Sequence, residues 1–250
     1  MTIDTESIVL TALMFTAALL YSSVGHAGAS GYLAAMALMG ISPAVMKPTA
    51  LALNILVAVI ATFKFYRVGA FSWRLFLPLA ITAVPCAYLG GLLTLPSNIY
   101  KPVIGVVLLY AAWYSFRTAS KTTPYQIRPV PIPLLSFSGA VLGFLSGLTG
   151  VGGGIFLSPL MLFFRWAEIK TISGVAAAFI LVNSIAGLTG VLSKAPALSS
   201  ALPLWALVVV VGGYIGAEYG SKRFQNPTLQ KLLALVLVIA GIKMIATAWS

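Results

Sequence analysis

The chain has 250 residues, of which 60% are hydrophobic and only 8% are charged. Soluble domains usually carry about 25% charged residues, and a chain of this length cannot bury so much apolar surface in water. The composition therefore excludes an ordinary soluble domain and predicts a polytopic membrane protein. The formal net charge of +11 does not indicate a nucleic-acid partner, because the basic residues lie mostly in short loops and form no cluster interleaved with aromatics.

Ten apolar runs, each bounded by charge, glycine or proline, follow one another along the chain and leave no room for a separate soluble domain. The N-terminal stretch MTIDTES is acidic and lacks the basic segment of a cleaved signal, so we expect the first run to stay in the protein. We predict an all-α fold with membrane segments at residues 7–24, 29–41, 46–66, 73–95, 98–117, 132–147, 152–164, 171–192, 200–221 and 228–248.

Two junctions between these runs are rich in glycine: residues 25–31 read GHAGASG and residues 147–154 read GLTGVGGG. Glycine permits positive φ and close approach to the backbone, and irregular backbone persists at membrane depth only when it is buried or lines a polar cavity. The flanking runs have only about 13–18 residues, against about 20 for a full crossing. Each pair either crosses as two short segments or forms a re-entrant hairpin. We favour broken or re-entrant helices, because the glycines lie where such an element would turn.

The two halves of the chain carry the same features in the same order. Three glycines of the first cluster match three of the second at a shift of 122 residues: Gly25, Gly28 and Gly31 match Gly147, Gly150 and Gly153. A shift of 129 residues matches Asn54 with Asn183. We interpret residues 1–118 as a first transmembrane repeat, 119–131 as a cytoplasmic linker loop and 132–250 as a second repeat, each with five segments.

The loops on the two sides of the membrane differ in positive charge. With the N-terminus outside, the loops at 64–74, 117–128, 165–170 and 222–231 share one side and hold eleven basic residues. The other side holds four: Lys47, Lys101, Lys194 and Lys243. The positive-inside rule then predicts a periplasmic N-terminus and cytoplasmic basic loops. The two repeats would have opposite orientations, an arrangement that many secondary transporters share.

The glycine clusters and the asparagine-bearing segments form the candidate binding site. A helix that begins directly after each cluster would point free N–H groups and its positive dipole end at the turn, which makes an anion site without a charged side chain. The two turns of inverted repeats would meet near the middle of the membrane. The predicted substrate-binding residues are His26, Gly28, Ser30, Gly31, Asn54, Thr149, Gly150, Gly152, Gly153, Gly154, Asn183 and Ser184.

Several of these residues also have a purely structural interpretation. His26 could bind an anion or carry a proton, but Leu148 stands at its position in the second repeat, so a hydrogen-bonded structural histidine is favoured. Asn54 and Asn183 are either ligand contacts or interhelical hydrogen-bonding groups, because each buried amide needs partners.

Other residues have structural interpretations alone. Three glycines spaced by four predict close helix packing: Gly212, Gly216 and Gly220. We expect Lys47 to extend to the membrane interface, and Glu218 to form a surface ion pair with Lys222.

The inventory of reactive side chains excludes most catalytic chemistry. The chain has one histidine, one cysteine (Cys86) and four acidic residues, which supply no acid–base pair, nucleophile or metal-ligand set within the membrane. We therefore expect no enzyme activity, no metal and no cofactor.

Three stretches of the chain stand out: GLTGVGGGIFLSPLML, AAAFILVNSIAGLTG and the closing LVLVIAGIKMI. Together with the degenerate first-half copy, they resemble the sulfite exporter TauE/SafE family of bacterial membrane proteins. The GVGGG-x-x-x-x-P motif, Gly150 to Pro159, carries most of the likeness. The resemblance implies a multi-pass inner-membrane permease for sulfite, sulfoacetate or related organosulfonates and acids, usually an exporter. The first-repeat sequence GHAGASG departs from the glycine-rich pattern.

These observations together predict a secondary transporter that moves a small sulfur-containing anion by alternating access around the two glycine turns. A passive anion channel, an importer of a small organic acid and an assembly subunit are the alternatives. The expected partners are the small anion and the lipid bilayer, and the glycine-rich outer faces are compatible with a homodimer.

Overall fold

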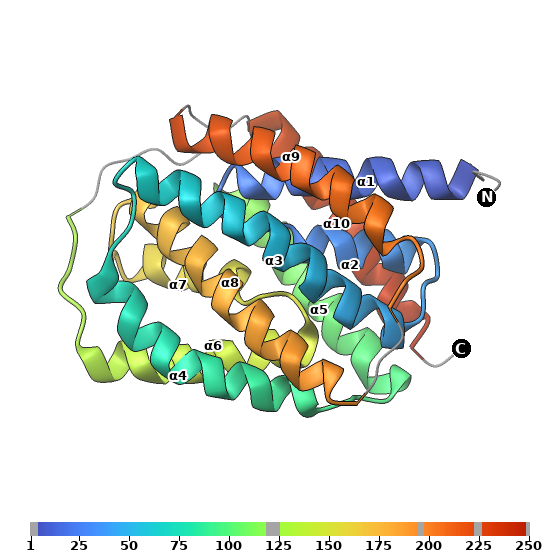
Figure 1. Ribbon diagram of the computed structural model, residues 1–250, viewed down its shortest axis with the longest axis horizontal. Helices are drawn as coiled ribbons and strands as arrows, with labels where there is room; N and C mark the ends of the chain where they lie inside the picture. The colour runs from blue at the N-terminus through green and yellow to red at the C-terminus, as the bar shows by residue number, and fades with distance from the viewer. Residues whose placement is uncertain (1–4, 119–125, 195–197, 223–226, 249–250) are drawn as a thin grey trace.

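The computed structural model describes residues 5–118, 126–194, 198–222 and 227–248. This part of the chain is helical and contains no strand (Figure 1). Its helices are α1 (Thr5–Ser22), α2 (Ala29–Leu38), α3 (Pro43–Arg67), α4 (Trp73–Leu92), α5 (Ser97–Thr118), α6 (Ile132–Thr149), α7 (Gly154–Phe163), α8 (Ile169–Leu192), α9 (Leu202–Lys222) and α10 (Pro227–Ala246). The all-α polytopic prediction is confirmed. Residues 1–4 of the predicted periplasmic N-terminus and 119–125 of the predicted linker lie outside the described residues.

Helix boundaries fall within a few residues of the predicted ones, and local chemistry explains the differences. Helix α3 begins three residues earlier than predicted, because Ser42 in extended conformation is followed by Pro43 at the first helical position, where a missing N–H has no cost. Helix α2 ends at Leu38, before Gly40 turns the chain with a φ of 71°.

Two helices are much shorter than a membrane crossing. Helices α2 and α7 have 10 residues each, so each is about 15 Å long, half of the roughly 30 Å hydrocarbon core. Each follows a longer helix and a glycine turn, so that α1–α2 and α6–α7 are hairpins (Figure 1). The second hairpin opens where Arg128 N donates to Arg165 O at 2.9 Å, which places the start of α6 beside the end of α7. This geometry agrees with broken, re-entrant elements.

Helix packing follows the proposed repeats. If α1–α5 are matched in order with α6–α10, the contact of α4 with α6 corresponds to that of α9 with α1, and the contact of α4 with α8 corresponds to that of α9 with α3. The remaining large contacts, α3 with α8 and α5 with α10, each join a matched pair. The pairing supports two structural repeats, whereas their opposite membrane orientation stays a prediction.

Glycines spaced by four form two close seams between helices. In the first seam, glycines of α6 face backbone carbonyls of α4: Gly139, Gly143 and Gly147 lie against Leu79, Ala83 and Ala87. In the second, glycines of α9 face α1: Gly212, Gly216 and Gly220 lie against Phe15, Leu19 and Ser23. Because a side-chain carbon would collide with these carbonyls, the helices approach as closely as small residues allow. The packing prediction for Gly212, Gly216 and Gly220 is confirmed.

We expect Gly143→Val to lower the stability of the protein by about 1–3 kcal/mol, the usual cost of overpacking, because the new side chain meets the Ala83 backbone. The thermal unfolding midpoint in detergent measures the effect. Val141→Phe, a larger change at a 43% exposed position of the same helix, is the control. Equal midpoints for the two variants would contradict a backbone seam.

Candidate functional site

The second glycine cluster is a turn that glycine alone adopts without strain. Gly150, Gly152 and Gly153 have φ values of 83°, 82° and 80°, in the left-handed region that side-chain-bearing residues rarely enter. In the first cluster Gly28 has a φ of 109° and directly precedes α2. Both half-length helices therefore begin immediately after a left-handed glycine, inside the protein.

The two clusters touch each other through His26. Its Nε2 lies 3.0 Å from the carbonyl oxygen of Gly154, 128 residues away, and 3.2 Å from Oγ of Ser158. Because a carbonyl oxygen only accepts, Nε2 donates the proton of this buried bond. His26 thus joins the first turn to the first residue of α7, as a structural hydrogen-bonding histidine would.

Asn54 of α3 uses both ends of its amide inside the protein. Its Oδ1 accepts from the backbone N–H of Ala29, the first residue of α2, at 3.1 Å, and its Nδ2 lies 3.2 Å from Oγ of Ser184 on α8. Asn54 therefore supplies the N-terminal cap that Gly28 cannot give to α2. It also lies directly against Gly152, where an added side-chain carbon would collide with its Nδ2.

Asn183, the counterpart of Asn54 in the second repeat, has no partner within the described structure. Its side chain is fully buried, and neither Oδ1 nor Nδ2 makes a hydrogen bond. It lies one helical turn after Phe179, which packs against Gly153, and one turn before Gly187, which packs against Gly147. Asn183 therefore shares the face of α8 that covers the second cluster. An unmade hydrogen bond of this kind costs about 1–3 kcal/mol.

Backbone donors are also free at the start of α7. The N–H groups of Phe156 and Leu157 both donate to the Gly153 carbonyl at 3.1 Å. The four preceding amides, from Gly152 to Ile155, donate to no acceptor in the part of the chain that the structure describes. These buried N–H groups lie at the positive end of the helix dipole, and successive amides in such a turn form an anion-binding concavity.

The other predicted site residues mainly support the turns. The Thr149 hydroxyl donates to the Leu145 carbonyl at 2.6 Å and accepts from Val151 N at 3.4 Å, and the Thr149 carbonyl accepts from the Tyr100 hydroxyl at 3.0 Å. Gly31 packs against Ala17 and Tyr21.

Ser30 and Gly150 also belong to the predicted site residues. Ser30 is buried in the first turn of α2, and Gly150 packs against Lys47. The geometry therefore brings His26, Asn54, Gly152, Gly154 and Ser184 into one contact group.

The expectation that Lys47 extends to the interface is wrong. Its side chain is only 6% exposed, and Nζ donates to the carbonyls of Gly90 and Gly91 at 3.3 Å and of Leu93 at 3.0 Å. These carbonyls lie at the C-terminal end of α4, where the Gly90 carbonyl also accepts from Leu93 N at 3.3 Å, and a lysine there is favourable for the helix dipole. The sequence signal was the glycine pair at the end of α4, which leaves its carbonyls open to a neighbour.

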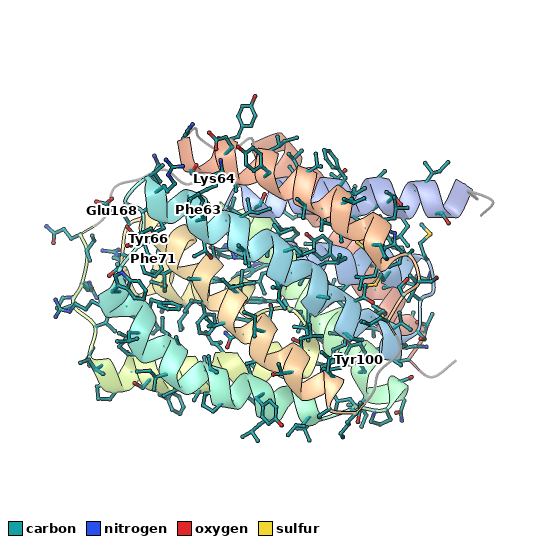
Figure 2. All side chains as sticks on the ribbon, viewed as in Figure 1. Phe63, Lys64, Tyr66, Phe71, Tyr100 and Glu168 are labelled. Carbon is teal, nitrogen blue, oxygen red and sulfur yellow. The ribbon has the colours of Figure 1, made fainter. Side chains whose placement is uncertain are left out.

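A cluster of ion pairs lies at the end of the molecule opposite Tyr100 (Figure 2). The Glu218 carboxylate pairs with Lys222, as expected, and also with Lys64 of α3, whose Nζ lies 4.0 Å from the Tyr214 ring centroid. Figure 2 shows Lys64 at the opposite end from Tyr100. The described residues contain no group of three side chains that could hold a metal ion.

Comparisons with known proteins agree with the resemblance. A family model described as sulfite exporter TauE/SafE matches residues 10–244. The chain is 42% identical over 245 residues to probable membrane transporter protein y4hK of Sinorhizobium fredii, covering 97% of this chain and 99% of that protein. It is 27% identical over 259 residues to probable membrane transporter protein YjnA of Bacillus subtilis, covering 96% and 99%. No solved structure gives a significant match.

The two asparagines are expected to respond oppositely to replacement by leucine. Asn54→Leu leaves Ala29 N and the Ser184 hydroxyl without their partner and should cost about 1–3 kcal/mol. Asn183→Leu removes a buried amide that has no partner, so stability should stay unchanged or rise. Thermal unfolding midpoints of the two variants in one detergent measure this, and the reverse order would contradict the assignment.

Proposed function

We propose that this chain, a membrane transporter that belongs to the sulfite exporter TauE/SafE family, is a secondary transporter for a small sulfur-containing anion such as sulfite or an organosulfonate. Its direction would be export across the bacterial inner membrane. The observation that carries the proposal is the set of free buried donors at the second turn, the amides of Gly152 to Ile155 together with the Asn183 side chain.

These donors are neutral, which favours a compact oxyanion with one charge, such as hydrogensulfite, the protonated form of sulfite, or a sulfonate. Lys47, the cation packed against Gly150, already donates to three carbonyls of α4. The cost of moving an ion out of water is large and grows as the square of its charge in the Born description, so a dianion would need a cation that the turn does not offer. Several N–H groups can together bind the oxygens of a sulfite or sulfonate group.

Alternating access would use the contacts between the repeats. The α1–α2 and α6–α7 hairpins meet at the bond between His26 and Gly154, and at one end Lys64 and Glu218 join α3 to α9. We propose that the repeats move against each other so that the turn opens first to one side of the membrane and then to the other. The Lys64–Glu218 pair would close the cytoplasmic end.

We expect saturable sulfite flux in proteoliposomes that contain only this protein. A monoanionic sulfonate should compete better than sulfate, and chloride should compete little. Asn183→Leu should weaken the apparent affinity by about 10-fold or more, the loss of one hydrogen bond to a charged group, and Gly152→Leu and Gly153→Leu should abolish flux while membrane insertion persists. Val141→Phe is the control and should transport normally.

The outcomes separate the alternatives. Flux that does not saturate and shows no counterflow would indicate a passive anion channel. Flux of small carboxylates without any of sulfite would indicate an organic-acid importer. Normal transport by both glycine variants would remove the second turn as the site.

The predicted orientation has its own test. Reporter fusions within 67–74 and within 222–226 should both be cytoplasmic, and a fusion at the N-terminus should be periplasmic, because the basic loops remain inside. If the first two fusions lay on opposite sides of the membrane, the inverted-repeat proposal would fail.

A further inference from the structure

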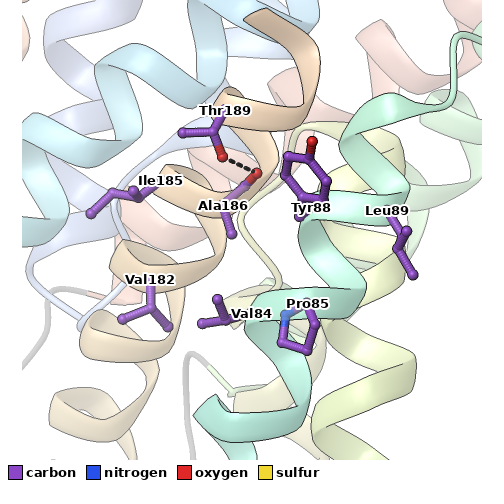
Figure 3. Close-up of a pocket in the computed structure, with 8 residues that line it drawn as sticks. All are labelled: Val84, Pro85, Tyr88, Leu89, Val182, Ile185, Ala186 and Thr189. Atoms are coloured by element: carbon purple, nitrogen blue, oxygen red, sulfur yellow. Dashed lines mark hydrogen bonds between the residues drawn. The ribbon is translucent and has the colours of Figure 1, made fainter. Parts of the chain in front are cut away.

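A groove lies between α4 and α8, apart from the candidate transport site (Figure 3). Its volume is about 690 Å³. The residues that line it are Val84, Pro85, Tyr88 and Leu89 of α4 and Val182, Ile185, Ala186 and Thr189 of α8. Leu89 and Ile185 are 54% and 46% exposed, so the groove opens on the outer surface of the helix bundle.

The groove follows from how the two helices approach. Helices α4 and α8 touch closely where Gly91 faces Gly187 and where Gly190 faces the Tyr88 carbonyl. The groove lies beside this contact, and Pro85 of α4 is one of the residues that line it. Asn183 and Ser184, on the buried face of α8, point away from this surface.

Polarity changes along the groove from one end to the other. Val84 and Val182 form an apolar end, and Tyr88 and Thr189 lie one to two helical turns further along (Figure 3). Five residues past Thr189, Lys194 follows the end of α8, where its exposed Nζ lies 3.4 Å from Oγ1 of Thr94. A ligand that follows this path needs an apolar chain at one end and a polar head at the other.

The charge at the polar end selects the kind of head. Three other lysines of this predicted side donate to backbone carbonyls: Lys47 to the end of α4, Lys101 to Thr247 and Lys243 to Leu38. Lys194 has only the long bond to a hydroxyl and keeps donors for a ligand. Glu168 and Lys64, the partner of Glu218, both lie at the end of the molecule opposite Tyr100 (Figure 2).

We propose that this groove, defined by the eight lining residues and Lys194, binds an anionic phospholipid from the surrounding bilayer. One acyl chain lies along α4 and α8 over Val84, Val182 and Ile185, and the phosphate accepts from Lys194. The bound lipid fills the space beside the α4–α8 contact and stabilises that pair of helices. This lipid site is independent of the transported substrate.

The test compares phosphatidylglycerol with phosphatidylcholine of the same acyl chains, added to the full-length protein in a neutral detergent. We expect phosphatidylglycerol to raise the thermal unfolding midpoint saturably and by more than phosphatidylcholine, and we expect native mass spectrometry to show a retained lipid. Lys194→Gln should abolish this preference. Lys101→Gln removes one positive charge at the same end but away from the groove, and should keep it.

A second variant tests the acyl-chain part of the site. Ala186→Phe fills the groove and should reduce lipid retention, while leaving Lys194 in place. If Ala186→Phe does not fold, Val84→Phe fills the same groove from α4 at a 38% exposed position. Equal effects of the two lipids on the wild type, or an unchanged preference in Lys194→Gln, would overturn the proposal. Full retention in the filled variant would do the same.

Discussion

Every backbone amide and carbonyl that leaves a helix inside a bilayer must find a partner in the protein, because the hydrocarbon offers none. This chain interrupts helices twice within its bundle, and much of its polar chemistry satisfies those interruptions. Asn54 caps α2, Tyr100 holds the carbonyl of Thr149, and Lys47 takes the carbonyls that end α4. Amides without an acceptor in the described part of the chain remain at both turns: those from Gly152 to Ile155 in the second, and those of Ala27, Gly28, Ser30 and Gly31 in the first.

The two proposed repeats share an order of helices and glycine turns but differ in how the polar groups of those turns are paired. The first turn is joined to its neighbours through Asn54 at Ala29 and through His26 at Gly154. The second turn has more left-handed glycines and an asparagine without a partner. Both turns therefore keep backbone amides without an acceptor in the described part of the chain, and the second adds an asparagine amide without a partner.

Sequence reasoning could predict the elements because periodic apolar runs, glycine turns and prolines act locally. The ten segments, the broken pairs and the packing role of Gly216 all followed from such patterns. It could not distinguish Asn54 from Asn183, since both lie in apolar helices and only tertiary contacts show which amide is engaged. Lys47 was misassigned for the same reason, because the helix end that it caps lies more than 40 residues away. Glu218 likewise gained a partner, Lys64, 154 residues distant.

The short length of α2 has a consequence for biosynthesis. A segment of 10 residues cannot hold a stable transmembrane position alone, so α2 must wait for α3 to emerge from the ribosome and deliver Asn54 to its first amide. The close contact between α1 and α9 forms later still, because its glycines belong to α9. Helix α1 thus meets α9, its main neighbour, only after the segments between them have been translated.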